Sequence, residues 1–377
     1  MDIRQFKAGT FRKQEGYKSF LPETVNHPWI VGDMKLAALQ SRADRKLGEL
    51  NAASRWVDDI DFFISMHIAK EATTSSRIEG TQTTIDEALA AKSDIEPERR
   101  DDWTEVQNYI AAMRFAIGRL RNIPLSGRLL KETHKVLLQG VRGKHKNPGD
   151  YRRSQNWLGS SLKNAVYVPP SQENVPELMS DLEKFLHNEN LDVPPLTRIG
   201  IAHYQFESIH PFLDGNGRLG RLLITLYLVS AKILERPTLY LSDFFERNRM
   251  EYYDRLTRAR EKNDLDGWLQ FFLAGIIETS ENSIRTLERI SVLRHELETQ
   301  RVQQLGKRAN HGRELIKLLY KHPILDRQRI ERELNISAST ASRLLDDFVL
   351  LKILDETTGY RRNRRYAFSE YLNIFKE

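Results

Sequence analysis

The chain has 377 residues and a formal net charge of +6, from 58 Lys and Arg against 52 Asp and Glu. The excess is local, because residues 301–377 hold 16 basic and 10 acidic side chains and residues 1–300 hold 42 of each. This distribution points to one basic module at the C-terminal end. Cysteine is absent, which excludes disulfides, thiolate nucleophiles and cysteine-ligated zinc or iron–sulfur sites.

No stretch of the sequence has the pattern of a targeting or membrane segment. The first 20 residues are polar and charged and lack the apolar core of a signal peptide. The longest apolar run, residues 222–231, falls short of the roughly 18–20 residues that a bilayer span needs. We therefore expect no membrane partner and a cytoplasmic location.

Helical periodicity dominates the chain, so the fold class is predicted to be mainly α. Apolar residues recur at helical spacing over 103–120, 129–138, 175–186 and 198–209. Residues 164–168, followed by two prolines, instead predict a short extended hairpin. A charged helix around 281–306 then leads to three predicted helices at 313–320, 326–334 and 339–350, and to a hairpin of 352–356 with 366–368.

Residues 210–221 read His-Pro-Phe-Leu-Asp-Gly-Asn-Gly-Arg-Leu-Gly-Arg. The spacing of Gly215, Gly217 and Gly220 also occurs in dinucleotide-binding loops, but such a loop must follow a buried strand. Here the preceding segment, 198–209, is an amphipathic helix, and no alternation of strands and helices surrounds it. We therefore exclude dinucleotide binding.

The same segment predicts a phosphate cradle. Gly215, Asn216 and Gly217 can turn tightly ahead of a helix over 219–228, whose free N–H groups favour an anion. Arg218 and Arg221 are three residues apart, so both project from one side of that helix and can clamp further phosphates.

Two neighbouring side chains add a metal ligand and a base to the cradle. Asp214 offers a hard oxygen, which suits a Mg²⁺ ion held largely by substrate phosphates. His210 has an intrinsic pKa near neutrality, which suits a general base. Together these groups predict phosphoryl or nucleotidyl transfer.

Residues 210–221 match the signature of the Fic family, H-P-F-x-[D/E]-G-N-G-R-x-x-R, at every fixed position. The chain resembles this family over about 60–280. Residues 147–152 and 155–157 resemble the segment ahead of the family's flap. Residues 165–170 resemble the flap itself, and 242–256 resemble the segment that closes over the nucleotide base. The resemblance implies a Fic-type helical core with a small β-hairpin flap.

The resemblance also implies protein adenylylation, on target proteins and on the protein itself. His210 would take the proton from a Ser, Thr or Tyr hydroxyl, whose oxygen would attack the α-phosphate of ATP, while Asp214 would hold Mg²⁺. The implied ATP-binding residues are Gly215, Asn216, Gly217, Arg218, Leu219, Gly220, Arg221, Asn248 and Tyr252. The flap residues Val166, Tyr167 and Val168 would align the target as an added strand.

An inhibitory segment is implied upstream of the signature. Ser75, Glu79 and Gly80 fit the family's inhibitory motif, [S/T]-x-x-x-E-[G/N]. Ser75 and Glu79 are four residues apart and share one helical face, and Gly80 is a plausible helix terminator. We expect an inhibitory helix at about 66–80 whose Glu79 pairs with Arg221 and withdraws it from the γ-phosphate of ATP.

The C-terminal segment with the net positive charge, residues 306–377, resembles a winged helix-turn-helix domain. In that geometry the third helix enters a DNA groove and the wing meets phosphates. The implied DNA contacts are Ser339, Ser342 and Arg343 on the helix, and Arg361, Arg362, Arg364 and Arg365 on the wing. Domains of this kind also serve in dimerisation or substrate docking, so that alternative stays open.

The predicted layout has four parts. An N-terminal helical region, 1–100, precedes a Fic catalytic domain at 101–280, a helical connector at 281–305 and the winged helix at 306–377. The resemblance also makes a homodimer plausible. Two alternatives to adenylylation remain: a DNA-binding regulator whose Fic domain senses nucleotide, and a Fic enzyme that uses another nucleotide or removes AMP.

Overall fold

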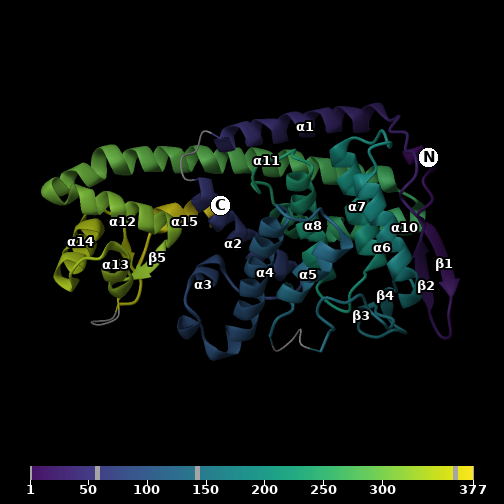
Figure 1. Ribbon diagram of the computed structural model, residues 1–377, viewed down its shortest axis with the longest axis horizontal. Helices are drawn as coiled ribbons and strands as arrows, with labels where there is room; N and C mark the ends of the chain where they lie inside the picture. Colours follow the sequence, from purple (N-terminus) through teal and green to yellow (C-terminus); the bar gives the residue numbers. More distant parts are fainter. Residues whose placement is uncertain (1, 56–59, 141–144, 360–363, 377) are drawn as a thin grey trace.

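The computed structural model describes residues 2–55, 60–140, 145–359 and 364–376, and its architecture is mainly α-helical (Figure 1). The longest helix, α11 (Leu265–Glu296), runs from the large helical body to a small C-terminal module, and α1 (Met34–Arg55) lies alongside it. The predicted fold class is confirmed. Among the described residues, no helix combines the length and apolarity needed to cross a bilayer.

The other helices of the body surround a central pair. These elements are α2 (Ile60–Ile78), α3 (Ile85–Leu89), α4 (Arg100–Arg119), α5 (Gly127–Leu137), α6 (Val175–His187), α9 (Ser242–Arg247) and α10 (Arg249–Lys262), with 3₁₀ turns at Ile3–Gln5, Lys92–Asp94, Pro97–Arg99 and Gln172–Asn174. Helices predicted at 103–120, 129–138 and 175–186 are present within a few residues of those bounds.

The central pair is α7 (Pro195–Ile209) and α8 (Asn216–Ser230). Pro195 starts α7 at a position where a missing N–H costs nothing, and every later residue of α7 is buried. Its polar side chains are buried together with its apolar ones, so α7 lies in the core of the body. The six-residue loop between the two helices is therefore fixed from both ends, and the signature covers this loop and the first residues of α8.

Two antiparallel hairpins lie at one side of the body. The strands β3 (Leu158–Gly159) and β4 (Ala165–Tyr167) pair with an irregular register, where the flap hairpin is predicted. A second hairpin, β1 (Gly9–Lys13) with β2 (Lys18–Pro22), is not predicted from the sequence. Four of the five residues of β1 are exposed, so it lacks the apolar alternation that reveals a strand.

The C-terminal module contains the three predicted helices and the predicted hairpin. The helices are α12 (Ala309–Lys321), α13 (Arg327–Leu334) and α14 (Ala338–Leu350). The strands β5 (Ile324–Asp326), β6 (Asp355–Glu356) and β7 (Arg365–Ala367) form an antiparallel sheet in the order β5-β7-β6. The predictions missed β5 and the last helix, α15 (Ser369–Lys376).

The connection into this module is helical but not uniform. Helix α11 passes through position 281 without a break, and a π-helical turn (Leu297–Arg301) and a 3₁₀ segment (Val302–Arg308) follow. Gly306 has φ +56°, a left-handed conformation that glycine adopts at little cost, and this residue breaks the helical path. The described chain therefore bends at the predicted start of the C-terminal module.

The module packs against helix α2 of the body. Phe375 on α15 contacts Phe63 and His67 on α2, with ring centroids 6.4 and 5.3 Å apart. Tyr320 on α12 stacks near Phe62 at 6.3 Å. Two ion pairs, Lys376–Asp86 and Arg365–Asp94, join the same two parts. The body and the module therefore share an apolar contact with a charged rim.

Candidate functional site

The loop between α7 and α8 closes through its own side chains and backbone. His210 ends α7 in a left-handed conformation with φ +49°, and its N–H donates to the carbonyl of Phe206. The side chain of Asn216 forms two hydrogen bonds with the backbone of Phe212. Its Oδ1 accepts from the Phe212 N–H and its Nδ2 donates to the Phe212 carbonyl, both at 2.8 Å. Gly215 takes φ +75° at the start of α8. These features explain the residues that the signature requires there.

Three side chains outside the loop hold its carbonyl groups. Arg152 Nε donates to the carbonyl of His210 at 3.0 Å, and Asn156 Nδ2 donates to that of Phe212 at 2.8 Å. His134 Nε2 lies 3.0 Å from the carbonyl of Asp214. The first N–H groups of α8 have no intrahelical acceptor by position, so they are the groups left to meet an anion.

The tautomer of His134 follows from its contacts. Its Nδ1 accepts the N–H of Gly149 at 2.9 Å, so its proton must lie on Nε2, which donates to Asp214. Burial lowers the pKa of His134 to about 4, which keeps the ring neutral. The ring also stacks on Phe212 at 3.9 Å. The sequence marks this residue only as a histidine on the buried face of a helix, and its role was missed.

His210 is neutral at physiological pH. Burial lowers its pKa to about 4, although the charge of Glu79 acts in the opposite direction. Its Nδ1 is buried, and the backbone of Glu207 also acts to raise the pKa. A neutral imidazole can accept a proton at a ring nitrogen, as the prediction of a general base requires.

The two signature arginines are almost fully buried. Arg218 has an exposed side-chain fraction of 5%, and its guanidinium lies 3.4 Å from Glu105 and 3.7 Å from Asp214. The side chain of Arg221 is only 1% exposed. Both arginines project from the first turns of α8, beside the cradle.

Arg221 is engaged by the end of α2. Its Nη2 lies 2.7 Å from Glu79 Oε1 and 2.9 Å from the carbonyl of Ser75, and its Nε donates to Ser75 Oγ at 2.8 Å. Burial alone would lower the pKa of Arg221, but Glu79 raises it above its ordinary value. Burial would likewise raise the pKa of Glu79, and Arg221 lowers it below its ordinary value. Gly80, with φ +107°, follows directly after Glu79.

The carboxylate of Glu79 also stands over the cradle. A Cβ on Gly217 would lie 2.3 Å from Glu79 Oε1, so only glycine leaves room for this approach. A carboxylate at the start of a helix occupies the kind of position that a phosphate prefers. Helix α2 is held in place by the buried Glu71, which accepts hydrogen bonds from Ser242 and Tyr109.

The residues predicted for the nucleotide base differ in exposure. Tyr252 is buried, stacks on Phe245 at 4.4 Å and donates its hydroxyl to His203 Nε2, while His203 Nδ1 donates to the carbonyl of Gly220. Asn248 donates its side-chain amide to the carbonyl of Phe244. The neighbouring Tyr253 is partly exposed, at 38%. His203 therefore ties the cradle helix to α10, a link that the sequence did not reveal.

Of the three residues predicted for the flap, one points outward. Val166 is 82% exposed, whereas Tyr167 and Val168 are buried. The hydroxyl of Tyr167 donates to the carbonyl of Ser208 on α7. The flap is therefore anchored beside the loop that carries His210.

The side chains predicted to contact DNA fall into three groups. Ser339 and Arg343 are exposed on α14, and Ser342 is partly buried there. Arg364 and Arg365 line a cleft of about 840 Å³ between the module and Asp94, and Arg365 pairs with that aspartate. Arg361 and Arg362 lie outside the described residues.

The predicted metal ligand stands by itself. Asp214 accepts the N–H of Gly215 and lies near Arg218, and the described residues hold no group of three or more His, Asp or Glu side chains able to bind a metal. A single carboxylate beside a phosphate cradle fits a Mg²⁺ ion whose other ligands are substrate phosphates and water.

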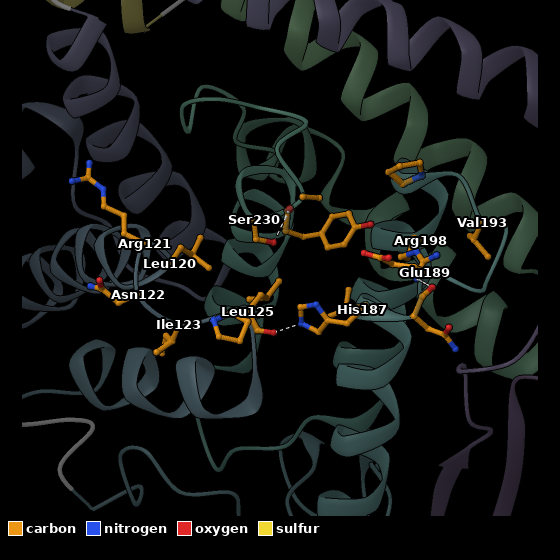
Figure 2. A pocket seen from close by; sticks show the side chains of 16 residues that line it. Leu120, Arg121, Asn122, Ile123, Leu125, His187, Glu189, Val193, Arg198 and Ser230 are labelled. Atoms are coloured by element: carbon orange, nitrogen blue, oxygen red, sulfur yellow. Dashed lines mark hydrogen bonds between the residues drawn. The ribbon is translucent and has the colours of Figure 1, made fainter.

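A separate cavity of about 650 Å³ lies at the opposite ends of α7 and α8 (Figure 2). Its buried Arg198 donates to the carbonyls of Phe185, Asn188 and Leu191, and its His187 hydrogen-bonds to that of Leu125. These side chains hold neighbouring backbone segments together. The chemistry described above therefore concentrates at the N-terminal end of α8.

Two family models match the parts of the chain that hold this site. Residues 37–118 match the model of the Fic/DOC family N-terminal region, and residues 124–228 match that of the Fic/DOC family. A protein adenylyltransferase Fic of Drosophila grimshawi is 27% identical over 258 residues, 66% of this chain and 48% of the relative. One of Culex quinquefasciatus is 30% identical over 189 residues, 48% of this chain and 34% of the relative. The chain thus spans about half or less of the curated relatives it matches.

Solved structures share the fold. A Fic family protein from Desulfovibrio desulfuricans aligns with a TM-score of 0.56 at 22% identity, covering 91% of this chain and 98% of the other. Fic-1 from C. elegans aligns with a TM-score of 0.51 at 23% identity, covering 69% of this chain and 74% of the other. The signature loop, its supporting helices and both family models lead to one conclusion: residues 124–228 are a domain of the Fic/DOC family, preceded at 37–118 by the family's N-terminal region.

Proposed function

We propose that the protein is a protein adenylyltransferase, which transfers AMP from ATP to a hydroxyl side chain of a target protein. The observation that carries this proposal is the convergence at one loop of a neutral histidine, a helix N-terminus without a side-chain cap and two buried arginines. Relatives described as protein adenylyltransferases support it.

In the proposed reaction, the triphosphate lies at the N-terminus of α8, with Arg218 and Arg221 on its outer phosphates. His210 takes the proton of the target hydroxyl as the hydroxyl oxygen bonds to the α-phosphorus. The bond from the α-phosphorus to the bridging oxygen breaks, and pyrophosphate leaves. Asp214 is the residue that would hold Mg²⁺, which supplies charge neutralisation to the phosphates when bound.

The same geometry supports autoinhibition by α2. While Glu79 pairs with Arg221 and stands over Gly217, a γ-phosphate would meet a carboxylate instead of a free guanidinium. Like charges in a buried site repel strongly, so ATP would bind in an unproductive position or weakly. Ser75 contributes by holding the same guanidinium through its hydroxyl and its carbonyl.

The test is incubation with α-labelled ATP and Mg²⁺. We expect the Glu79→Gly variant to label itself at least tenfold more than the wild-type protein, and the Glu79→Gly/His210→Ala variant to lose the label. Absence of label in every variant with every nucleoside triphosphate would refute the transfer. Equal labelling of wild type and Glu79→Gly would refute the inhibition alone. A preference for another triphosphate, or release of AMP from a labelled protein, would select one of the alternative Fic activities.

DNA binding by the C-terminal module is a second candidate. The exposed Arg343 and Ser339 on α14 and the net charge of the module favour it, whereas Asp94 already engages Arg365. A salt-sensitive mobility shift of duplex DNA by the full chain would support it. Sedimentation of the same sample tests the expected homodimer.

A further inference from the structure

The N-terminal hairpin packs directly on the flap. The N–H of Phe20 on β2 donates to the carbonyl of Val168 at 2.9 Å, at the end of the flap. The ring of Phe20 lies 6.2 Å from that of Tyr167 and 5.0 Å from that of Phe11. A row of aromatic contacts therefore runs from the hairpin into the strand beside the active site.

The hairpin is fixed to the body at further points. The N–H of Ala8 donates to Asn263 Oδ1 at 2.8 Å, after the end of α10. The side-chain amide of Gln205 on α7 donates to the carbonyl of Glu23 at 2.8 Å. A Cβ on Gly9 would lie 2.1 Å from the carbonyl oxygen of Leu21, so the two strands approach each other closely. A surface anchored this way is held rigid relative to His210.

Hairpin and flap together present an apolar pair over a groove. Phe11 is 51% exposed and Val166 is 82% exposed, and these two large apolar side chains line the same groove. A groove of about 220 Å³ lies between them, and Lys18, Lys163 and Arg260 contribute to its walls. The groove's one acidic lining residue among the described residues is Glu261.

The surroundings of this groove are basic. Residues 6–20 contain four basic side chains, Lys7, Arg12, Lys13 and Lys18, against the single acid Glu15. Within the described ranges, neither Lys18 nor Lys163 forms an ion pair, and both are exposed. Arg260 lies over the ring of Tyr167, with its guanidinium carbon 4.1 Å from the centroid. Unpaired basic groups beside an apolar pair fit a partner that is acidic and carries an apolar side chain.

We propose that the N-terminal hairpin and the flap form one docking surface, which selects target segments with acidic residues next to an apolar residue close to the modified hydroxyl. The proposal rests on the proposed transfer of AMP to protein hydroxyls. The extended segment runs along the flap, its apolar side chain enters between Phe11 and Val166, and its carboxylates face Lys18 and Lys163.

The test uses the Glu79→Gly protein, α-labelled ATP and three peptide libraries with a central Ser, Thr or Tyr. In every library the flanking positions include an apolar residue. The other flanking positions hold Asp and Glu in the acidic library, Gln in the neutral library, and Lys and Arg in the basic library. We expect labelling of the acidic library to exceed that of the basic library by at least tenfold. We expect the added Lys18→Glu/Lys163→Glu change to reduce labelling of the acidic library at least tenfold, while the KM for ATP stays within twofold.

A matched control carries Lys35→Glu/Lys307→Glu instead. Both positions are exposed, lie outside the hairpin and the flap, and give the same change in net charge. We expect the control to label the acidic library at the rate of its parent. Since all four lysines are exposed, thermal unfolding should be nearly equal in the two variants.

The outcomes separate the docking surface from the chemistry. No label on any peptide or on the protein itself would refute the proposed function. Labelled peptides with no acidic preference, or equal losses in the two charge-reversal variants, would refute the docking surface alone. Inhibition of peptide labelling by a 20-base-pair DNA duplex in the parent, but not in Lys18→Glu/Lys163→Glu, would assign the surface to nucleic acid and overturn the proposal.

Discussion

The pKa of Glu207 is set by two opposing effects, its burial and the charge of a neighbouring arginine. It lies on α7 three residues before His210, and its carboxylate points at Gly220, where a Cβ would lie 2.3 Å from Oε1. That oxygen is buried and has no hydrogen-bond partner among the described residues. Burial raises its pKa to about 7, because the positive charge of Arg221 only partly offsets desolvation.

This raised pKa predicts a pH-dependent cost to stability. The protonated form is favoured in the folded protein, so its stabilisation is complete below pH 4.5 and is lost as the pH rises through about 7. We expect the melting temperature of Glu207→Gln, minus that of the wild type, to increase as the pH is raised from 5 to 8. Thermal unfolding of both proteins measures this difference. The exposed Glu189→Gln is the control for the amide substitution itself. A difference independent of pH would contradict the prediction.

At the scale of residues, the sequence predicts those that belong to the signature and misses those that support it. The contact of Glu79 with Arg221 joins two positions more than 140 residues apart, and a spacing motif was enough to suggest it. His134, His203 and Glu207 carry no such motif. Each is a polar residue on a buried helix face, and only the packing of the helices shows which carbonyl or carboxylate it meets.

At the scale of elements, the loop 210–215 is held by hydrogen bonds from α5 and from the segment after it. His134→Phe would keep a ring against Phe212 and remove both the donor to Asp214 and the acceptor for Gly149. Leaving such buried groups unsatisfied costs about 1–3 kcal/mol. In the Glu79→Gly background we therefore expect self-labelling to slow by about tenfold or more.

Thr133→Val is the matched control for that variant. It lies next to His134, is equally buried and donates its hydroxyl within its own helix, to the carbonyl of Leu129. The self-labelling rate of Thr133→Val in the Glu79→Gly background should stay close to that of Glu79→Gly alone. If both variants lose activity only in proportion to their loss of melting temperature, His134 acts through overall stability and not through the loop.

Helices and strands were predicted correctly where the sequence has strong apolar periodicity. They were missed where tertiary contacts determine the local conformation. Helices α4 to α8 follow their apolar faces closely. The strand β1 is largely exposed, and the three-residue β5 gains its conformation by pairing with β7. Neither leaves a pattern of its own in the sequence.

At the scale of the whole molecule, the C-terminal module braces the helix that ends at the inhibitory residues. Phe375 is 2% exposed and contacts His67 on α2, about two turns before Ser75. Phe375→Ala would open a cavity at this contact, at a cost of about 3–5 kcal/mol. We expect faster hydrogen exchange across residues 60–78 and increased self-labelling of a protein that otherwise keeps Glu79.

The exposed Leu350→Ala on α14 is the control for that variant, because it lies in the same module and is 81% exposed. It should leave both measurements unchanged. Unchanged exchange of α2 in Phe375→Ala would show that the module and the inhibitory helix are energetically independent. The sequence placed the module at the end of the chain but offered no means of predicting what it packs against.

The position of α2 in the chain has a consequence for biosynthesis. A ribosome makes residues 60–80 before it makes the loop at 210–221, so the segment that ends in Glu79 already exists when Arg221 emerges. Domains fold as they leave the ribosome, N-terminal parts first. On the proposed function, the inhibitory segment is therefore present before the arginine that it pairs with, whereas Phe375, which braces α2, is made after both.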